Sequence, residues 1–329
     1  MRAVVVHSFG SPSEIKVEDV SSAPITLGHV RVRVHAVGCG FPDALMIAGK
    51  YQAKMELPFT PGTEFAGVVT EMSAEIEHFR LGMRVLGTVT QGAMAEECVV
   101  PVHSLARMSE KMSMREAAAF LVNYGTTYHA LKQRANLRPG ETLLVVGATG
   151  GTGIAAIELG KALGGRVLAG VGSDEKLALA TQHGADAAFN YSSQSIKEAV
   201  ATFSDGKGID VVYDPVGSAL AEQCVRAMAW NGRYLVIGFA GGSIPSIPLN
   251  LPLLKGCAII GVFWGAHTRR EPALHANNMR ELFELFEQNK LRPEVTSLRG
   301  LDSIQDALQL LEQRRARGKL VLHLVDESV

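Results

Sequence analysis

"LLVVGATGGTGIAAIELGKALG", Leu143–Gly164, joins an apolar run to a helical pattern through four glycines within seven positions. Glycines 147, 150 and 153 are spaced G-x-x-G-x-x-G, and counted from Ala148 the spacing is G-x-G-x-x-G with alanine first. In either register the turn is tight, backbone N–H groups can approach a pyrophosphate, and the helix start adds partial positive charge. A plain glycine-rich turn is the alternative, but the strand–loop–helix–strand order favours a dinucleotide. We predict that the loop binds it through Gly147, Ala148, Thr149, Gly150, Gly151, Thr152 and Gly153.

The pattern around this loop predicts an α/β protein. After it, apolar strand-like runs (RVLAGV, AAFNY, IDVVYDPV, GRYLVIGF) alternate with helical segments of roughly 10–15 residues, which indicates βαβ units and a parallel sheet. Before about residue 120, short strand-like runs are broken by Gly and Pro, which indicates a β-rich, barrel-like domain.

Composition excludes several classes of protein. The 329 residues suggest two domains, and a net charge of −1 gives no basic footprint for nucleic acid. The four cysteines form no C-x-x-C pair, which excludes a zinc ribbon or thioredoxin motif and fits a reducing compartment. No apolar run is long enough for a bilayer or for a signal-peptide core. We predict a cytoplasmic protein with no membrane or nucleic-acid partner.

The second strand of the βαβ unit indicates which nucleotide is preferred. Proteins that bind NAD usually end this strand with Asp or Glu, which holds the ribose hydroxyls, whereas here it ends at Gly172 and Ser173. The small residues leave room for a 2′-phosphate, and Lys176 follows one helical turn later. Asp174 and Glu175 oppose this charge argument unless they point outward, and Lys176 taken alone reads as a solvated helix residue. The pattern favours NADPH over NADH.

Four further motifs carry a family resemblance that runs essentially end to end. They are PFTPGTEFAGVV (58–69), NYGTTYHAL (123–131), DPVG (214–217) and RRARGKLVL (314–322). With the glycine loop, they resemble the medium-chain dehydrogenase/reductase superfamily, and within it the zinc-free quinone oxidoreductase group that includes ζ-crystallin. The resemblance implies a GroES-like catalytic domain over 1–122 and 262–329, a Rossmann doubly wound parallel-sheet domain for NADPH over 123–261, and a homodimer.

The resemblance also bears on zinc. Zinc-dependent relatives carry G-H-E where this chain has G-T-E, with Thr63 in place of the histidine and Glu64 after it. Their first ligand, a cysteine, falls at about Gly40, with Cys39 one residue away, and their third falls near Asn123. A catalytic zinc needs three protein ligands, so we predict that no metal is bound and that alcohols are not oxidised.

Cofactor contacts follow from the same resemblance. It assigns the 2′-phosphate to Ser173, Lys176, Tyr191 and Arg314. Arg314 could instead form a surface salt bridge, with Arg315 or Arg317 serving in its place. It places Thr126 near the nicotinamide. Its remaining cofactor-binding positions are Gly172, Val216, Gly217, Gly238, Phe239, Ala240, Phe263, Trp264 and Lys319.

The implied reaction is hydride transfer to an electron-poor acceptor such as a quinone, an α,β-unsaturated carbonyl or an enoyl thioester. Tyr51 is the candidate proton donor, and an amphipathic residue at a loop edge is an equal reading. Phe41, Leu45 and Tyr124 are further substrate-lining candidates. Relatives carry Asn and Tyr where this chain has Gly40 and Leu45, which implies a roomier, more apolar pocket and a larger or lipophilic acceptor.

Other candidates have competing readings. Tyr128 is a possible donor that a packed helix face explains as well, and Asp43 is expected to hold a loop or helix start. One reading has an anionic substrate group, such as a CoA phosphate, bound by His267, Arg269 and Arg270. The other is that these residues form an exposed polar loop. The alternative functions are an enoyl-thioester reductase and a low-turnover, NADPH-binding structural or regulatory protein. NADPH oxidation with a quinone, compared with an enoyl-CoA, separates the two kinds of reductase, and tight NADPH binding without turnover indicates the binding protein.

Overall fold

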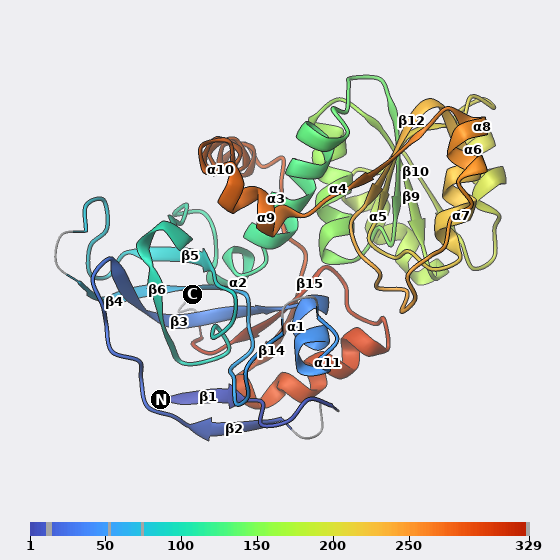
Figure 1. The fold of residues 1–329 in the computed structure, drawn as a ribbon. Coiled ribbons are helices and arrows are strands. Elements are labelled where there is room, and N and C mark those ends of the chain that lie inside the picture. The colour runs from blue at the N-terminus through green and yellow to red at the C-terminus, as the bar shows by residue number, and fades with distance from the viewer. Residues whose placement is uncertain (11–14, 52–53, 74–75, 327–329) are drawn as a thin grey trace. The chain divides into compact units, whose positions relative to one another are not determined.

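The computed structural model describes residues 1–10, 15–51, 54–73 and 76–326 (Figure 1). Its contacts divide the chain into two compact units, Met1–Val122 with Pro293–Val329 and Asn123–Arg292. The predicted first domain includes 262–292, whereas these residues belong to the second compact unit. The reason is local packing: helices α9 (Trp264–Arg270) and α10 (Pro272–Glu287) contact each other and the π-helical segment His129–Arg134, which follows α3 (Leu121–Tyr128).

The second unit is built on a six-stranded sheet in which every strand pair is parallel (Figure 1). The strand order is β10-β9-β8-β11-β12-β13, so the direction of winding reverses between β8 and β11. This is the doubly wound arrangement of nucleotide-binding folds, and it confirms the predicted fold class. The strands are β8 (Thr142–Val146), β9 (Arg166–Val171), β10 (Ala187–Asn190), β11 (Ile209–Asp214), β12 (Met228–Val236) and β13 (Ala258–Gly261).

Helices that follow the strands bury the sheet. Strand β8, TLLVV, is buried at every position, as expected when both faces of a parallel strand are covered. One core cluster joins Leu144 and Val212 of the sheet to apolar residues of three helices, among them Val200, Val225 and Leu251. The helices of this unit that lie between strands are α4 (Gly151–Ala162), α5 (Leu177–Gln182), α6 (Ile196–Phe203), α7 (Leu220–Arg226) and α8 (Asn250–Lys255).

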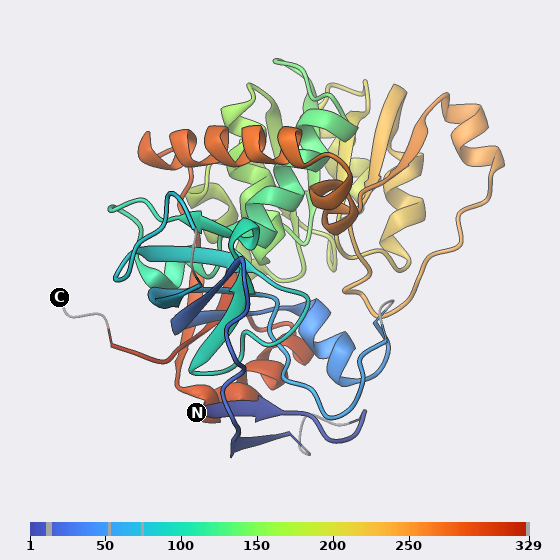
Figure 2. The same ribbon diagram turned by 60° about the vertical axis from the view of Figure 1, so that its left-hand side comes forward.

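The first unit is β-rich, as predicted (Figure 2). Its long strand β3, HVRVRVHAVGC, alternates buried valines with more exposed polar residues, as expected for a strand with one face on the core. The sheet order is β14-β15-β3-β4-β5-β7, with β6 also paired to β3, and β1 and β2 form a separate pair. The strands are β1 (Arg2–Val5), β2 (Lys16–Asp19), β3 (His29–Cys39), β4 (Glu64–Met72), β5 (Arg84–Thr88), β6 (Glu97–Pro101), β7 (Leu105–Arg107), β14 (Val295–Arg299) and β15 (Lys319–His323).

The C-terminal residues complete this unit. Helix α11 (Ile304–Glu312) contributes Ile304 and Leu308 to the core that also contains Val32 and Phe65, and β15 pairs antiparallel with β3. Two short helices, α1 (Phe41–Ile47) and α2 (Met114–Ala117), follow β3 and β7.

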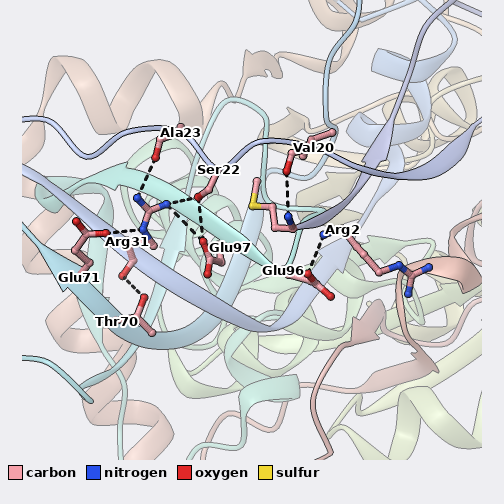
Figure 3. A network of polar contacts seen from close by, with 10 residues as sticks. Arg2, Val20, Ser22, Ala23, Arg31, Thr70, Glu71, Glu96 and Glu97 are labelled. Carbon is pink, nitrogen blue, oxygen red and sulfur yellow. Dashed lines mark hydrogen bonds and ion pairs between the residues drawn. The ribbon is translucent and has the colours of Figure 1, made fainter.

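Arg31 on the more exposed face of β3 joins three separate segments (Figure 3). Its guanidinium donates to Glu71 Oε2 at 2.8 Å and to the carbonyl of Ala23 at 3.0 Å, and it also contacts Ser22 and Glu97. The extended chain between β2 and β3 is thereby attached to the sheet.

Within the described residues, no helix is both long enough and apolar enough to cross a bilayer.

Candidate functional site

The glycine loop lies where the winding of the sheet reverses. Gly147 follows β8 with φ of +62°, a left-handed conformation that glycine adopts without strain. A Cβ at Gly147 would lie 2.7 Å from Cγ2 of Val216, so the loop after β8 touches the turn after β11. In open α/β sheets, ligands bind beside the carboxyl ends of the strands at this reversal.

Packing within the protein requires glycine at some positions of the loop but not at others. A Cβ at Gly153 would overlap the carbonyl oxygen of Gly147, and one at Gly151 would lie 2.5 Å from the Asn123 amide. These two glycines are needed for packing within the protein. A Cβ at Gly150 would meet only Gly147 O, at an ordinary 3.5 Å. Packing within the protein therefore does not require glycine at position 150. The absence of a side chain there instead fits the close approach of a pyrophosphate to the backbone.

The start of α4 fits the same ligand. Gly150 is the N-cap residue and has no side chain that could accept from the first N–H groups of the helix. These groups remain available for an anion, and the helix dipole favours negative charge at this end.

Asp214, which is not among the site residues predicted from the sequence, shapes the neighbouring turn. Its Oδ1 accepts from the backbone N–H of Val216 at 2.7 Å and of Gly217 at 2.8 Å, while Tyr234 donates its hydroxyl to Oδ2. Burial and the Asp214 charge raise the pKa of Tyr234, so the phenol stays a donor. The DPVG motif was a signal for this turn, but the Tyr234 partner lies on another strand.

The loop after β12 is attached to this turn. Ala240 donates its N–H to the carbonyl of Pro215 at 3.0 Å, and a Cβ at Gly217 would lie 3.0 Å from the Phe239 ring. The structure thus brings together the predicted cofactor residues of the two loops, Val216, Gly217, Gly238, Phe239 and Ala240, beside the glycine loop.

The predicted 2′-phosphate residues of this unit follow the ends of β9 and β10. A Cβ at Gly172 would lie 3.2 Å from the Tyr191 hydroxyl, so the phenol lies at the end of β9. Ser173 follows Gly172, and Lys176 ends the single turn of helix that comes next. The Asp174 carboxylate in the same turn accepts from Asn190 at 2.9 Å. Arg314 is an exposed residue of the first unit, and its role stays a prediction.

Trp264, which is distant from Thr126 in the sequence, packs against α3 next to it. Thr126 is half-buried, and a Cβ on the preceding Gly125 would lie 2.7 Å from the Trp264 indole. Phe263, just before α9, is 67% exposed. The indole thus packs against α3 beside the residue predicted to approach the nicotinamide.

Two tyrosines on α3 are buried, and their hydroxyl groups are bonded within the second unit. Tyr124, predicted to line the substrate site, is 1% exposed and donates its hydroxyl to Glu158 Oε2 at 2.7 Å. Tyr128 is buried, and its hydroxyl contacts Glu281 and accepts from Lys132 at 3.1 Å. Both phenols are committed to partners inside the second unit, because α3 packs against α4 and α10 there.

In the first unit, Asp43 holds the start of α1. Its carboxylate accepts from the backbone N–H of Gly40 at 2.8 Å and of Gly62 at 3.2 Å, which confirms the predicted holding role and ties α1 to the segment before β4. Burial raises the pKa of Asp43 to about 6.

The predicted substrate residues of this unit lie on and after α1. Phe41 and Leu45 are half-buried on that helix, and Tyr51 is half-buried with its side chain against the core. Burial, and then the Asp43 charge, raise the pKa of Tyr51. The phenol is therefore protonated near neutral pH and able to donate.

Lys319, predicted to bind the cofactor, lies instead in a buried ion pair. Its ammonium contacts Glu64 Oε1, whose other oxygen accepts from Val122 N–H at 3.1 Å. Burial alone would lower the pKa of Lys319, but the carboxylates of Glu64 and Asp43 outweigh it and raise that pKa. Its position, 7% exposed, supports a structural ion pair rather than a cofactor contact.

The first unit does not fit a catalytic zinc. A Cβ at Gly40, where zinc-dependent relatives carry a cysteine, would lie only 3.0 Å from the Lys319 ammonium. The Cys39 thiol is fully buried, and burial raises its pKa, which disfavours a thiolate ligand. Among the described residues, no three or more His, Cys, Asp or Glu side chains are grouped to hold a metal ion.

Comparisons with known proteins agree with this arrangement. Residues 26–110 match the family described as the alcohol dehydrogenase GroES-like domain, and residues 151–284 match the family described as zinc-binding dehydrogenase. The quinone oxidoreductase-like protein 2 homolog of Nematostella vectensis is 40% identical over 325 residues, covering 98% of this chain and 88% of the relative.

Solved structures give the same result. The quinone oxidoreductase of Thermus thermophilus, determined alone and with NADPH, is 34% identical with a TM-score of 0.85, over 98% of this chain and 100% of that one. The Escherichia coli quinone oxidoreductase complexed with NADPH is 25% identical with a TM-score of 0.90, over the same shares. The chain therefore belongs to the quinone oxidoreductase family of the medium-chain dehydrogenase/reductase superfamily.

Proposed function

We propose that this oxidoreductase reduces quinones or related α,β-unsaturated carbonyls with NADPH. The observation that carries the proposal is the bare backbone of Gly150 at the reversal point of the sheet, together with relatives that were solved with NADPH. Bound NADPH supplies the hydride, and the protein supplies orientation and a protected site.

The second unit provides the residues for the cofactor. The glycine loop and the start of α4 are suited to the pyrophosphate, and the loops held by Asp214 border it. At the end of β9, Ser173, Lys176 and Tyr191 form the proposed 2′-phosphate site. Thr126, with Trp264 packed beside it, is the proposed nicotinamide contact.

The proposed reaction needs no metal. A conjugated acceptor delocalises the negative charge that forms as hydride adds, so a Lewis acid is not required, whereas alcohol oxidation depends on one. Glycine instead of a cysteine at position 40 and the buried, protonated Cys39 thiol support this mechanism. Metal analysis of the purified protein tests it, because one zinc per chain would contradict it.

Tyr51 is the proposed proton donor to the reduced acceptor, since its raised pKa keeps the phenol protonated. Phe41 and Leu45 present half-buried apolar side chains on α1. These residues favour a lipophilic acceptor over a small polar one.

The deciding experiment follows NADPH oxidation with 9,10-phenanthrenequinone and, separately, with crotonyl-CoA. We expect turnover with the quinone and little with the thioester. Faster turnover of crotonyl-CoA would assign an enoyl-thioester reductase, and tight NADPH binding without turnover of either would assign a binding protein. The predicted cytoplasmic location is independent of this outcome and stays a prediction.

We also propose that the protein is a homodimer. Strand β13 is an edge of the six-stranded sheet, and large apolar side chains are exposed on and around it. These are Trp230, Ile244, Leu249, Leu253, Leu254, Ile259 and Phe263.

A further inference from the structure

The chain passes between its two compact units twice, after Val122 and after Arg292. Both passages are bonded to the same atom. Tyr124, two residues into the second unit, donates its hydroxyl to Glu158 Oε2 at 2.7 Å. Arg292, the last residue of that unit, donates its backbone N–H to the same oxygen at 2.9 Å. One carboxylate oxygen therefore fixes both ends of the second unit.

Glu158 is an unusual residue for its position. It is 6% exposed on α4, a helix whose buried face is otherwise glycine, alanine, isoleucine and leucine. A buried carboxylate is costly unless hydrogen bonds satisfy it. Its second oxygen, Oε1, accepts from His183 Nδ1 at 2.7 Å, so three donors from three segments surround one side chain. The proposed nucleotide contacts make no use of it.

The other end of α4 contacts the first passage as well. The Asn123 amide lies against Gly151, the first residue of the helix, and Thr127 donates its hydroxyl to the carbonyl of Thr152 at 3.4 Å. The helix that begins at the glycine loop is therefore in contact with the first passage along two turns, and with the second passage through Glu158.

We infer that Glu158 is the positioning residue of a hinge, anchoring both chain passages to α4. Hinge motion is absorbed by a few residues at the ends of elements, and an anchor decides which residues those are. With Tyr124 and Arg292 held, backbone rotation falls to the residues before α3 begins at Leu121 and to those from Pro293 onward. Because α4 starts at the proposed pyrophosphate site, this inference rests in part on the proposed function: occupation of the loop and orientation of the units act on one rigid element.

Amide hydrogen exchange tests the anchor without any ligand. Glu158→Gln keeps the size of the side chain but leaves one acceptor oxygen for three donors. We expect exchange to rise at least about tenfold in peptides that contain Arg292 and in those that span 122–126. Tyr124→Phe removes only the first bond, so the rise is confined to 122–126. Lys161→Gln, which breaks an ion pair with Asp186 further along the same helix, is the control and changes neither peptide.

Steady-state kinetics provide a readout that a purely structural role would not move. If the anchor positions the units, Glu158→Gln lowers kcat about tenfold while the NADPH dissociation constant stays within about twofold. Unchanged exchange at Arg292, or a rise spread evenly over the second unit, overturns the inference. So does an unchanged kcat where exchange has risen. If wild-type protein fails to bind NADPH, the proposed function fails, while the exchange pattern of the free protein still tests the anchor.

Discussion

Gly150 and Gly153 illustrate how one motif combines ligand binding with packing. Alanine at 150 meets no protein atom closer than 3.5 Å, so the fold accommodates it, but its methyl group fills the space proposed for the pyrophosphate. We expect Gly150→Ala to raise the NADPH dissociation constant by about tenfold or more with an unchanged melting temperature. Fluorescence titration and thermal unfolding measure the two quantities.

Gly153→Ala is the matched variant. Its methyl group would overlap the carbonyl of Gly147, so we expect a loss of stability of about 1–3 kcal/mol, larger than the gain in helix propensity. Equal loss of affinity and stability in both variants would contradict the distinction between the two glycines.

Lys176 is expected to decide the choice of nucleotide. It is half-buried one turn after the end of β9, where the Tyr191 hydroxyl also lies. Lys176→Ala should weaken NADPH binding by about tenfold and leave NADH binding unchanged, because only NADPH carries the 2′-phosphate. Parallel titrations with the two nucleotides measure this. An equal loss for both would remove Lys176 from the phosphate site.

Tyr51 is expected to act on the acceptor and not on the cofactor. Tyr51→Phe keeps the ring against the core and removes only the hydroxyl. We expect kcat to fall by about tenfold to a hundredfold with the NADPH dissociation constant unchanged. Full activity of this variant with the quinone would exclude the phenol as donor, and Tyr124→Phe is unsuitable as its control because that hydroxyl is bonded to Glu158.

Among the helices and strands, those with a self-contained pattern were predictable. The buried strand TLLVV, the glycine loop and the helix after it are recognisable from the sequence alone. Contacts between segments that are distant in the sequence could not be predicted. The assignment of 262–292 depends on the His267 ring stacking on His129 at 3.9 Å, and no local pattern encodes that pairing.

The same reason explains two predicted site residues whose side chains have buried partners distant in the sequence. Tyr124 matched a motif, but its partner Glu158 lies on another helix. Lys319 also matched a motif, yet Glu64 on β4 holds it inside the first unit. Residue type and spacing predict a role only when the residue that bonds to the side chain is near in sequence.

The connection between α1 and β4 gives stability a pH dependence. Burial raises the pKa of Asp43 from its usual 3.8 to about 6, so the folded state prefers the protonated carboxyl. This contribution is fully present below about pH 4 and is lost as the pH rises through about 6. A shift of about two units corresponds to about 3 kcal/mol.

Asp43→Asn cannot titrate at this position and serves as the reference. We expect the free energy of unfolding of the wild type, minus that of the variant, to fall by about 3 kcal/mol between about pH 4 and pH 7. Urea titrations across this range measure it. A difference that stays constant, or that grows with pH, would contradict the raised pKa.

For the assembly of complete chains, the edge of the six-stranded sheet is the informative feature. Soluble proteins usually protect edge strands with charges, bulges or covering segments. Strand β13 leaves Ile259 39% exposed, and the neighbouring helix α8 leaves Leu253 77% and Leu254 71% exposed. A second copy of the chain with its β13 against this edge would extend the sheet and remove a large apolar patch from water.

Charged residues at this edge should therefore separate the two chains. The double variant Ile259→Lys with Leu253→Lys adds charge to the strand and the helix, and burial of two unpaired ammonium groups at an interface is unfavourable. We expect light scattering after gel filtration to give two chains for the wild type and one for the variant. Leu27→Lys is the control, since Leu27 is 75% exposed in the first unit and belongs to neither the six-stranded sheet nor α8, and this variant should stay dimeric. A monomeric wild type would contradict pairing through β13. Dissociation by Leu27→Lys alone would contradict it too, because apolar burial at the β13 edge would then not be the cause of assembly.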